Sequence, residues 1–338
     1  MAVAATTPAA HDPAAWTYAS GLASALEGRL LTQRATQELL DARDLDDLVT
    51  RVRQSLLFAD LAEGTAALDL AETMEAAYAA GIRTIRDACP APAVAELFLL
   101  PIEWQAYRVY LREQALGGQP VDTPGSAVPR EAWERCWATP DVEPRWARFA
   151  AAALNVREKM PREKHDERLV DEISEVYQAR DITHAATRLG NPQILAWVTT
   201  WLELRLALAL LRCARNDWGH IRYVDALDDF GVGQQEILAL VTPDRGDWRT
   251  PFAHLGLPTI LSVPDDHRDP APTVARLIDD RVTDLVRDAR GIPFGPEPVF
   301  AFLWALRVEA VNLKQIVAGV AAGLPGDAIA QEMRAPYV

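Results

Sequence analysis

The chain has 338 residues, of which 49% are hydrophobic, and a formal net charge of −14 at pH 7. This length suits two or three domains, and the abundance of Ala and Leu over β-branched residues favours helices over strands. The acidic charge and the absence of a basic stripe argue against nucleic acid or an anionic lipid surface as a partner.

Three further features of the sequence argue against a metal-bound or disulfide-linked fold, a secreted protein and a membrane-spanning protein. Cys89, Cys136 and Cys213 lie far apart without a Cys-x-x-Cys pair, so neither a zinc site nor a disulfide framework is predicted. The first 16 residues lack the basic and apolar regions of a signal peptide. Residues 194–213 are interrupted by Glu203 and Arg205, which argues against a membrane span. We therefore expect a soluble, intracellular protein.

The same helix is predicted three times along the chain. Each copy starts near a proline, which suits the first turn of a helix, and ends at Gly or Asn, which suits a left-handed cap. Pro92, Pro192 and Pro298 each stand eleven residues before a glutamate. The repeated glutamates are Glu103, Glu203 and Glu309, at intervals of 100 and 106 residues.

Apolar residues of the third copy follow one another at spacings of four and three residues, which predicts one buried stripe along a helix of a bundle. Trp197, Trp201 and Trp304 lie on the second and third of these predicted helices, and we expect them to pack in the core. The residues of the predicted stripe are Val299, Leu303, Leu306, Ala310, Leu313, Val317 and Val320.

Further helical stretches surround each of the three helices, so each unit of about a hundred residues is predicted to hold three or more helices. The units span residues 14–121, 127–226 and 227–335. No alternating stretch is long enough to predict a sheet. The sequence therefore predicts an all-α fold of three helical bundles.

One acidic motif resembles a metal site. Asp265–Asp269, with the sequence DDHRD, is similar to the motif with which class I terpene synthases hold Mg²⁺ against a diphosphate. Residues 216–223 loosely resemble the second metal motif of that family, but they precede the first motif instead of following it. The aspartates also lie between Pro264 and Pro270, in a predicted loop. A solvated loop is favoured, and an all-helical, Mg²⁺-dependent enzyme of terpene synthase type is the alternative function.

The remaining titratable residues do not form a recognisable site. His165, Glu167 and Glu172 lie in a charged helix start, without the i, i+4 spacing of a metal-binding helix. The other histidines have no carboxylate or serine at a spacing that suggests a triad. The sequence therefore predicts no catalytic residue, no metal site and no cofactor.

Residues 18–49, 168–215 and 294–333 resemble the family of the C subunit of V/A-type ATPases and ATP synthases, whose eukaryotic relative is the d subunit. The last segment carries the closing pattern of that family: an apolar helix with a glutamate, then Asn-Leu-basic, then Gly-Leu-Pro before a short helix. The first segment departs from the family, which usually has Asn and Arg residues after the tyrosine equivalent to Tyr18.

The resemblance implies three similar helical bundles around a pseudo-threefold axis, which together form a funnel. It implies a non-catalytic central-stalk socket that is peripheral on the cytoplasmic face of the membrane. One side would sit on the proteolipid c-ring, and the hollow would accept the central shaft made of subunits D and F. Rotation would then pass between ATP chemistry and proton or sodium transport.

The repeat and the resemblance together suggest candidate contact residues for the shaft or the ring. Glu103, Glu203 and Glu309 would lie near the funnel axis, where they would meet basic residues of the shaft. Arg108 and Lys314 occupy the basic position of the Asn-Leu-basic pattern in the first and third copies. A solvated or locally paired side chain on a bundle helix is nevertheless the favoured interpretation of the three glutamates.

Overall fold

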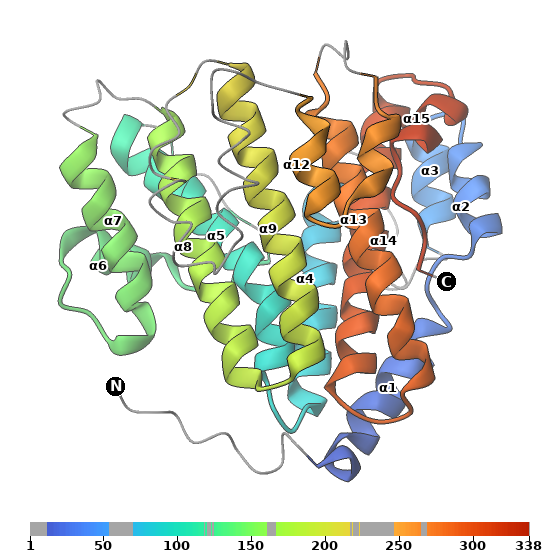
Figure 1. The fold of residues 1–338 in the computed structure, drawn as a ribbon, viewed down its shortest axis with the longest axis horizontal. Helices are drawn as coiled ribbons and strands as arrows, with labels where there is room; N and C mark the ends of the chain where they lie inside the picture. Colours follow the sequence, from blue (N-terminus) through green and yellow to red (C-terminus); the bar gives the residue numbers. More distant parts are fainter. Residues whose placement is uncertain are drawn as a thin grey trace.

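The computed structural model describes most of the chain, and every regular element in the described part is a helix (Figure 1). The described residues are 12–53, 70–117, 119, 123, 125–160, 167–216, 218, 223, 247–264 and 269–337. The predicted all-α class is confirmed for these residues. The α-helices are α1 (Thr17–Glu27), α2 (Gln33–Leu40), α3 (Leu45–Val52), α4 (Leu70–Ala88), α5 (Ala93–Leu116), α6 (Arg130–Ala138), α7 (Ala147–Lys159), α8 (Glu167–Leu189), α9 (Pro192–Arg215), α12 (Arg249–His254), α13 (Ala271–Val286), α14 (Pro296–Ala321) and α15 (Gly326–Glu332). Short 3₁₀ helices are η2 (Pro13–Trp16), η5 (Pro144–Trp146), η6 (Pro258–Ser262) and η7 (Arg287–Gly291).

The three predicted long helices are present as α5, α9 and α14. Pro92 directly precedes α5, Pro192 is the first residue of α9, and Pro298 lies in the first turn of α14. Gly117 ends α5 in the left-handed conformation, with φ 76°, which glycine adopts without steric cost. The predicted apolar stripe of α14 is fully or partly buried along its whole length.

Each long helix is the second arm of a helix hairpin, and the three hairpins contact one another in a closed cycle. The hairpins are α4–α5, α8–α9 and α13–α14. The second helix of each hairpin contacts the first helix of the next: α5 packs against α8, α9 against α13, and α14 against α4 (Figure 1). The repeat in the sequence is therefore a repeat of helix pairs in space.

Shorter helices cover the outside of this cycle. α1 packs against α14 and α4, α15 packs against α14 and α2, and α6 and α7 pair with each other beside α5 and α8. The buried residues of α6 and α7 share one apolar cluster with α5 and α8, so the core continues across the first predicted unit boundary. The second boundary, near residue 227, lies outside the described residues. The division into three units stays a prediction.

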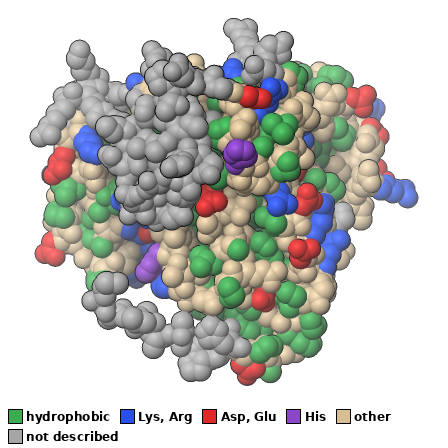
Figure 2. All heavy atoms as spheres, in the orientation of Figure 1, with side chains coloured by type: hydrophobic (Ala, Val, Ile, Leu, Met, Phe, Trp, Pro, Cys, Tyr) green, Lys and Arg blue, Asp and Glu red, His purple; other side chains and the backbone are tan. Residues whose placement is uncertain are grey.

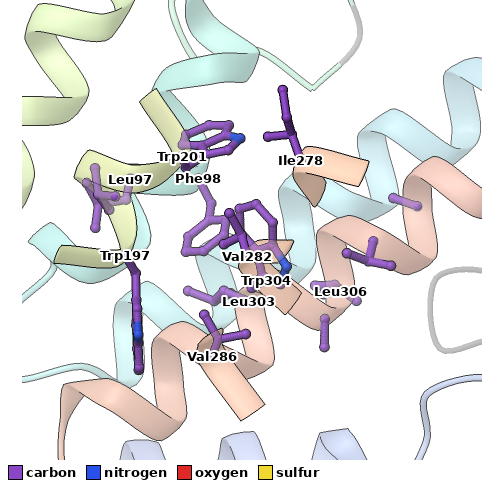
Figure 3. Packing of buried hydrophobic residues seen from close by; sticks show 14 of the residues in the cluster. Leu97, Phe98, Trp197, Trp201, Ile278, Val282, Val286, Leu303, Trp304 and Leu306 are labelled. Carbon is purple, nitrogen blue, oxygen red and sulfur yellow. The ribbon is translucent and has the colours of Figure 1, made fainter. Parts of the chain in front are cut away.

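Aromatic rings from the second helices of all three hairpins meet in the larger core (Figure 3). The ring centroids of Phe98 and Phe300 are 5.1 Å apart, those of Trp197 and Phe300 5.5 Å, and those of Trp201 and Trp304 5.7 Å. Tilted and edge-on pairs of this kind stabilise a core beyond the burial of their area. The prediction that the three tryptophans pack in the core is confirmed.

A second core joins the C-terminal half of α5 to α6, α7 and α8. Trp104 is fully buried there, and its Nε1–H donates a hydrogen bond to Asp181 Oδ2 at 2.7 Å. The Tyr107 hydroxyl donates to the backbone carbonyl of Phe149 at 2.9 Å. Both buried polar groups are thus satisfied, and they fasten α5 to α8 and to α7.

α9 is, within the described part of the chain, the helix that is long and apolar enough to cross a membrane. Of its most apolar window, 61% is buried inside the fold, where α9 packs between α8 and α13. A helix that is apolar on most sides and covered by neighbouring helices is typical of the centre of a bundle. The apolar character of α9 is accounted for by these contacts.

Candidate partner-binding site

The hairpins leave a cavity of about 150 Å³ between α5, α9 and α14, which we call the central cavity. Its wall is mostly apolar and receives side chains from all three second helices. Arg307 and Lys314 of α14 add positive charge to it. The apolar residues of the wall include Phe98, Ile102, Val198, Trp201, Phe300 and Trp304.

A second cavity of about 210 Å³ lies between α8, α9, α13 and α14, and it shares Trp201 and Arg307 with the central cavity. Four guanidinium groups line this cavity, against the two carboxylates of Glu175 and Asp279. We call it the arginine pocket. Its arginines are Arg205, Arg212, Arg307 and Arg334.

Asp279 neutralises two of these arginines. Its Oδ1 lies 3.0 Å from Arg307 Nη1, and its Oδ2 accepts a hydrogen bond from Arg334 Nε at 3.2 Å. All three side chains are at least four-fifths buried, with exposures of 8%, 18% and 13%. Asp279 therefore ties α13 to α14 and to the C-terminal segment through one charged cluster.

Glu175, the other carboxylate of the arginine pocket, also has partners. Its Oε2 accepts a hydrogen bond from the Tyr223 hydroxyl at 2.7 Å, and its Oε1 lies 3.7 Å from Arg108. Arg205 and Arg212 are exposed, and in the described part of the chain no carboxylate lies within ion-pair distance of either guanidinium. The pocket therefore has an excess of positive charge.

The two predicted basic residues, Arg108 and Lys314, hold equivalent ion pairs between neighbouring hairpins. Arg108 of α5 pairs with Glu175 of α8, and Lys314 of α14 pairs with Glu75 of α4. Glu75 and Glu175 are 100 residues apart, which is the interval between the first two copies of the repeat. At the third equivalent position Leu208 replaces the basic residue.

Glu103 of α5 has its closest ion partner in α7, because its Oε2 lies 3.6 Å from Arg148 Nη2. Burial raises the pKa of Glu103 above its ordinary value, and the positive charge of Arg148 opposes that rise. Arg148 also lies 2.9 Å from Asp181 of α8, the carboxylate that accepts the Trp104 hydrogen bond. Glu103 is therefore a locally paired side chain of the second core.

Glu309 of α14 is 7% exposed, and its Oε2 accepts a hydrogen bond from the backbone N–H of Leu31 at 2.6 Å. Leu31 lies between α1 and α2, so this bond ties the connection of those two helices to α14. The glutamate thus replaces the water that the backbone N–H would otherwise bind.

We expect Glu309→Ala to lower the free energy of unfolding by about 2 kcal/mol, because the Leu31 N–H loses a charged acceptor. Urea unfolding of the two proteins measures the difference. Glu309→Gln keeps an acceptor oxygen at the same place and should lose less. Equal losses for the two variants would show that the hydrogen bond is not what Glu309 contributes.

Glu203 of α9 differs from the other two repeated glutamates. It is partly buried, and in the described part of the chain no hydrogen bond or ion pair satisfies its carboxylate. Burial raises the pKa of Glu203 above its ordinary value of 4.5. The three repeated glutamates therefore lie in three different environments. Glu103 is paired with Arg148, Glu309 accepts a hydrogen bond from Leu31, and Glu203 has no such partner among the described residues.

The raised pKa of Glu203 predicts a pH-dependent effect. A carboxyl whose pKa is raised by folding adds stability below its unfolded pKa, and this stability is lost as the pH rises through the folded pKa. We therefore expect Glu203→Gln to be more stable than the parent by about 0.5 kcal/mol at neutral pH, after solvent screening, and equally stable near pH ~4. Urea unfolding at both pH values tests this, with Glu131→Gln on the exposed start of α6 as the control. A loss of stability at neutral pH would contradict the prediction.

The acidic motif of the sequence is described only at its last residue. Asp269 Oδ1 accepts a hydrogen bond from the backbone N–H of Ala271 at 3.1 Å, which caps the start of α13. Residues 265–268 and most of the second motif lie outside the described residues, as does His165. Glu172 is described and is buried in α8. Among the described residues, no three His, Cys, Asp or Glu side chains gather where they would hold a metal ion.

The arginine pocket was not predicted from the sequence. The available signal was the pair Arg205 and Arg212, which lie seven residues apart in a mostly apolar helix and therefore share one face of it. Arg307 and Arg334 come from distant parts of the chain, and only the fold brings them to α9.

The described part of the chain is an all-helical fold built from three repeated helix hairpins. Residues 19–332 match the family model of the ATP synthase (C/AC39) subunit. The chain belongs to that family, and the resemblance seen in the sequence is confirmed. As a member of this family of rotary ATPase subunits, it has partner subunits. No curated protein matches the chain.

Proposed function

We propose that this protein is the non-catalytic central-stalk socket of a V/A-type ATPase or ATP synthase. In this role it joins the central shaft, subunits D and F, to the proteolipid c-ring, and it passes rotation between ATP chemistry and proton or sodium transport. It works at the cytoplasmic face of the membrane as a peripheral component. Membership of the C/AC39 family supports the proposal.

The observation that carries the proposal is the closed cycle of hairpins with its two equivalent ion pairs. Arg108–Glu175 and Lys314–Glu75 join successive hairpins at positions related by the sequence repeat. Such equivalence is what a pseudo-threefold axis through the three second helices would produce. A funnel around that axis would have the central cavity and the arginine pocket on its inner side.

The five predicted contact residues divide into two groups in this proposal. Arg108 and Lys314 hold the hairpins together, while Glu103 and Glu309 hold α7 and the α1–α2 connection. We propose a structural role for these four. Glu203, whose carboxylate is only partly buried, stays a candidate contact for the shaft or the ring.

Affinity purification of the tagged full-length chain from gently solubilised native membranes tests the proposed function. We expect the shaft subunits and the proteolipid ring to be recovered in stoichiometric amounts, as judged by mass spectrometry. The same membranes carrying the untagged chain are the control. Recovery of the chain alone, as a soluble monomer, would overturn the proposal and would turn attention to Asp265–Asp269 with Mg²⁺ and prenyl diphosphates.

A further inference from the structure

We infer that the arginine pocket binds carboxylate side chains of a partner protein, presented by the end of the shaft that enters the socket. The inference rests on the proposed function, because it takes the shaft as the occupant. It also reverses the sign expected from the sequence, which placed acidic residues of this chain against basic residues of the shaft.

The charge of the pocket is the first support. Asp279 and Glu175 are already engaged with Arg307, Arg334 and Tyr223, as described above. Four guanidinium groups face these two carboxylates in the described wall of the pocket, so positive charge remains in excess there. On the face shown in Figure 2, acidic and basic side chains are interspersed. An excess of positive charge in one pocket of a protein of net charge −14 marks a site for an anionic group.

The indole of Trp201 is the second, independent support. Trp201 is 5% exposed, and its Nε1–H is buried without an acceptor. The guanidinium carbons of Arg205 and Arg307 lie 5.3 Å and 5.4 Å from the centroid of its ring. In Figure 3 the indole nitrogen is turned toward Ile278, another residue of the pocket wall. A buried donor beside two guanidiniums is unsatisfied until an acceptor enters the pocket.

The two cavities share part of their walls, and this indicates what kind of partner segment binds there. The arginine pocket and the central cavity share Ile182, Trp201 and Arg307, so one bound segment can contact both. The central cavity offers an apolar wall, and the arginine pocket offers guanidinium donors. A helix end with an apolar side chain and a neighbouring Asp or Glu fits this combination, because the apolar group is buried while the carboxylate receives bidentate hydrogen bonds.

Charge reversal in the pocket tests the inference. We expect R205E/R212E, purified as the tagged full-length chain from native membranes, to retain about tenfold less shaft than the parent, while it retains the ring. The matched control is R34E/R43E, which makes the same change in charge at side chains that are 91% and 84% exposed. The control should retain the shaft like the parent. Circular dichroism and the Tm establish that both variants are folded.

A lysine variant identifies the partner group directly. R205K/R212K keeps the positive charge of the pocket, and its primary amines can be joined to a carboxylate by a water-soluble carbodiimide, with loss of water to the reagent. We expect a covalent adduct with a shaft protein in this variant, and mass spectrometry of its peptides then names the acidic residue. An adduct with the ring alone would contradict the inference.

The outcomes separate the inference from the proposed function. Recovery of neither shaft nor ring by the parent chain overturns the proposed function, and the inference with it. Equal recovery of the shaft by the parent and by R205E/R212E overturns the inference alone. If inorganic phosphate raises the Tm of the parent but not of R205Q/R212Q, and shaft retention is equal, the pocket is a site for small anions and not for a partner carboxylate.

Discussion

Trp304→Ala is expected to lower the free energy of unfolding by about 3–5 kcal/mol, the usual cost of removing a buried tryptophan. Trp304 is 1% exposed at the place where α9, α13 and α14 meet. Its ring contacts Trp201 edge-on, and the guanidinium carbon of Arg307 lies 4.6 Å from its centroid. Alanine would leave a cavity that the surrounding helices cannot close, because each is held in its own hairpin.

Trp304 stabilises the fold both through its buried ring and through a hydrogen bond, and a second variant separates these two contributions to the free energy of unfolding. Its Nε1–H donates to Thr283 Oγ1 at 3.0 Å, and Thr283 is fully buried on α13. Trp304→Phe removes the donor but keeps most of the ring, so we expect a loss of about 1–2 kcal/mol. Guanidinium chloride unfolding measures both variants.

An exposed tryptophan supplies the matched control for this prediction. Trp218 is 37% exposed and contacts Arg168 through its ring, with 5.2 Å from the guanidinium carbon to the centroid. We expect Trp218→Ala to change the free energy of unfolding by less than about 1 kcal/mol. Similar losses for Trp218→Ala and Trp304→Ala would contradict the central position assigned to Trp304.

The long helices were predictable because their signals are local. A proline in the first turn, an apolar stripe and a terminal Gly or Asn lie within one helix, and they need no knowledge of its neighbours. The recurrence of these signals at equal intervals then indicated three equivalent hairpins. The closed cycle of hairpins was not accessible in this way, since it depends on which helix faces are covered by which partners.

The environments of the repeated glutamates were not predictable for the same reason. Equivalent positions in a repeat suggested equivalent roles, but each carboxylate has a different neighbour. Glu103 meets Arg148, and Glu309 meets Leu31, while Glu203 has no such partner in the described part of α9 or its surroundings. Repeats keep a common backbone, whereas the shorter helices packed around them differ.

The ion pairs between hairpins, by contrast, left a signal in the sequence. Arg108 and Lys314 occupy one repeated position, and Glu75 and Glu175 occupy another. A comparison of charge sign across repeat positions would have paired them before the fold was known. It would also have shown that Leu208 breaks the pattern on α9, the helix that carries the arginine pocket.

Asp279→Asn is expected to cost about 3–5 kcal/mol, because it removes the charge that neutralises two buried guanidiniums. Arg307 and Arg334 would keep their positive charges with exposures of only 18% and 13%. The change also weakens the hold on the C-terminal segment, since the Arg334 side chain loses its ionised acceptor, while the two backbone hydrogen bonds of Arg334 to Asn312, of 2.8 Å and 3.0 Å, remain. Urea unfolding measures the loss.

The same helix offers the matched control for Asp279→Asn. Asp284 of α13 pairs with Arg287 of η7, but the Asp284 side chain is 58% exposed. Exposed pairs of this kind contribute little, so we expect Asp284→Asn to change the free energy of unfolding by no more than about 0.5 kcal/mol. If the two variants lose the same amount, the buried cluster is not held together by the charge of Asp279.

Asp279→Asn also separates stability from partner binding. It removes a negative charge from the wall of the arginine pocket, so the pocket becomes more positive while the fold becomes weaker. Below its Tm, the variant should therefore retain an acidic shaft at least as well as the parent, whereas R205E/R212E should lose the shaft although it loses less stability than Asp279→Asn. The less stable of the two variants would then bind the shaft better, and the more stable one would bind it worse. This result follows only if the charge of the pocket, and not the rigidity of the bundle, governs binding.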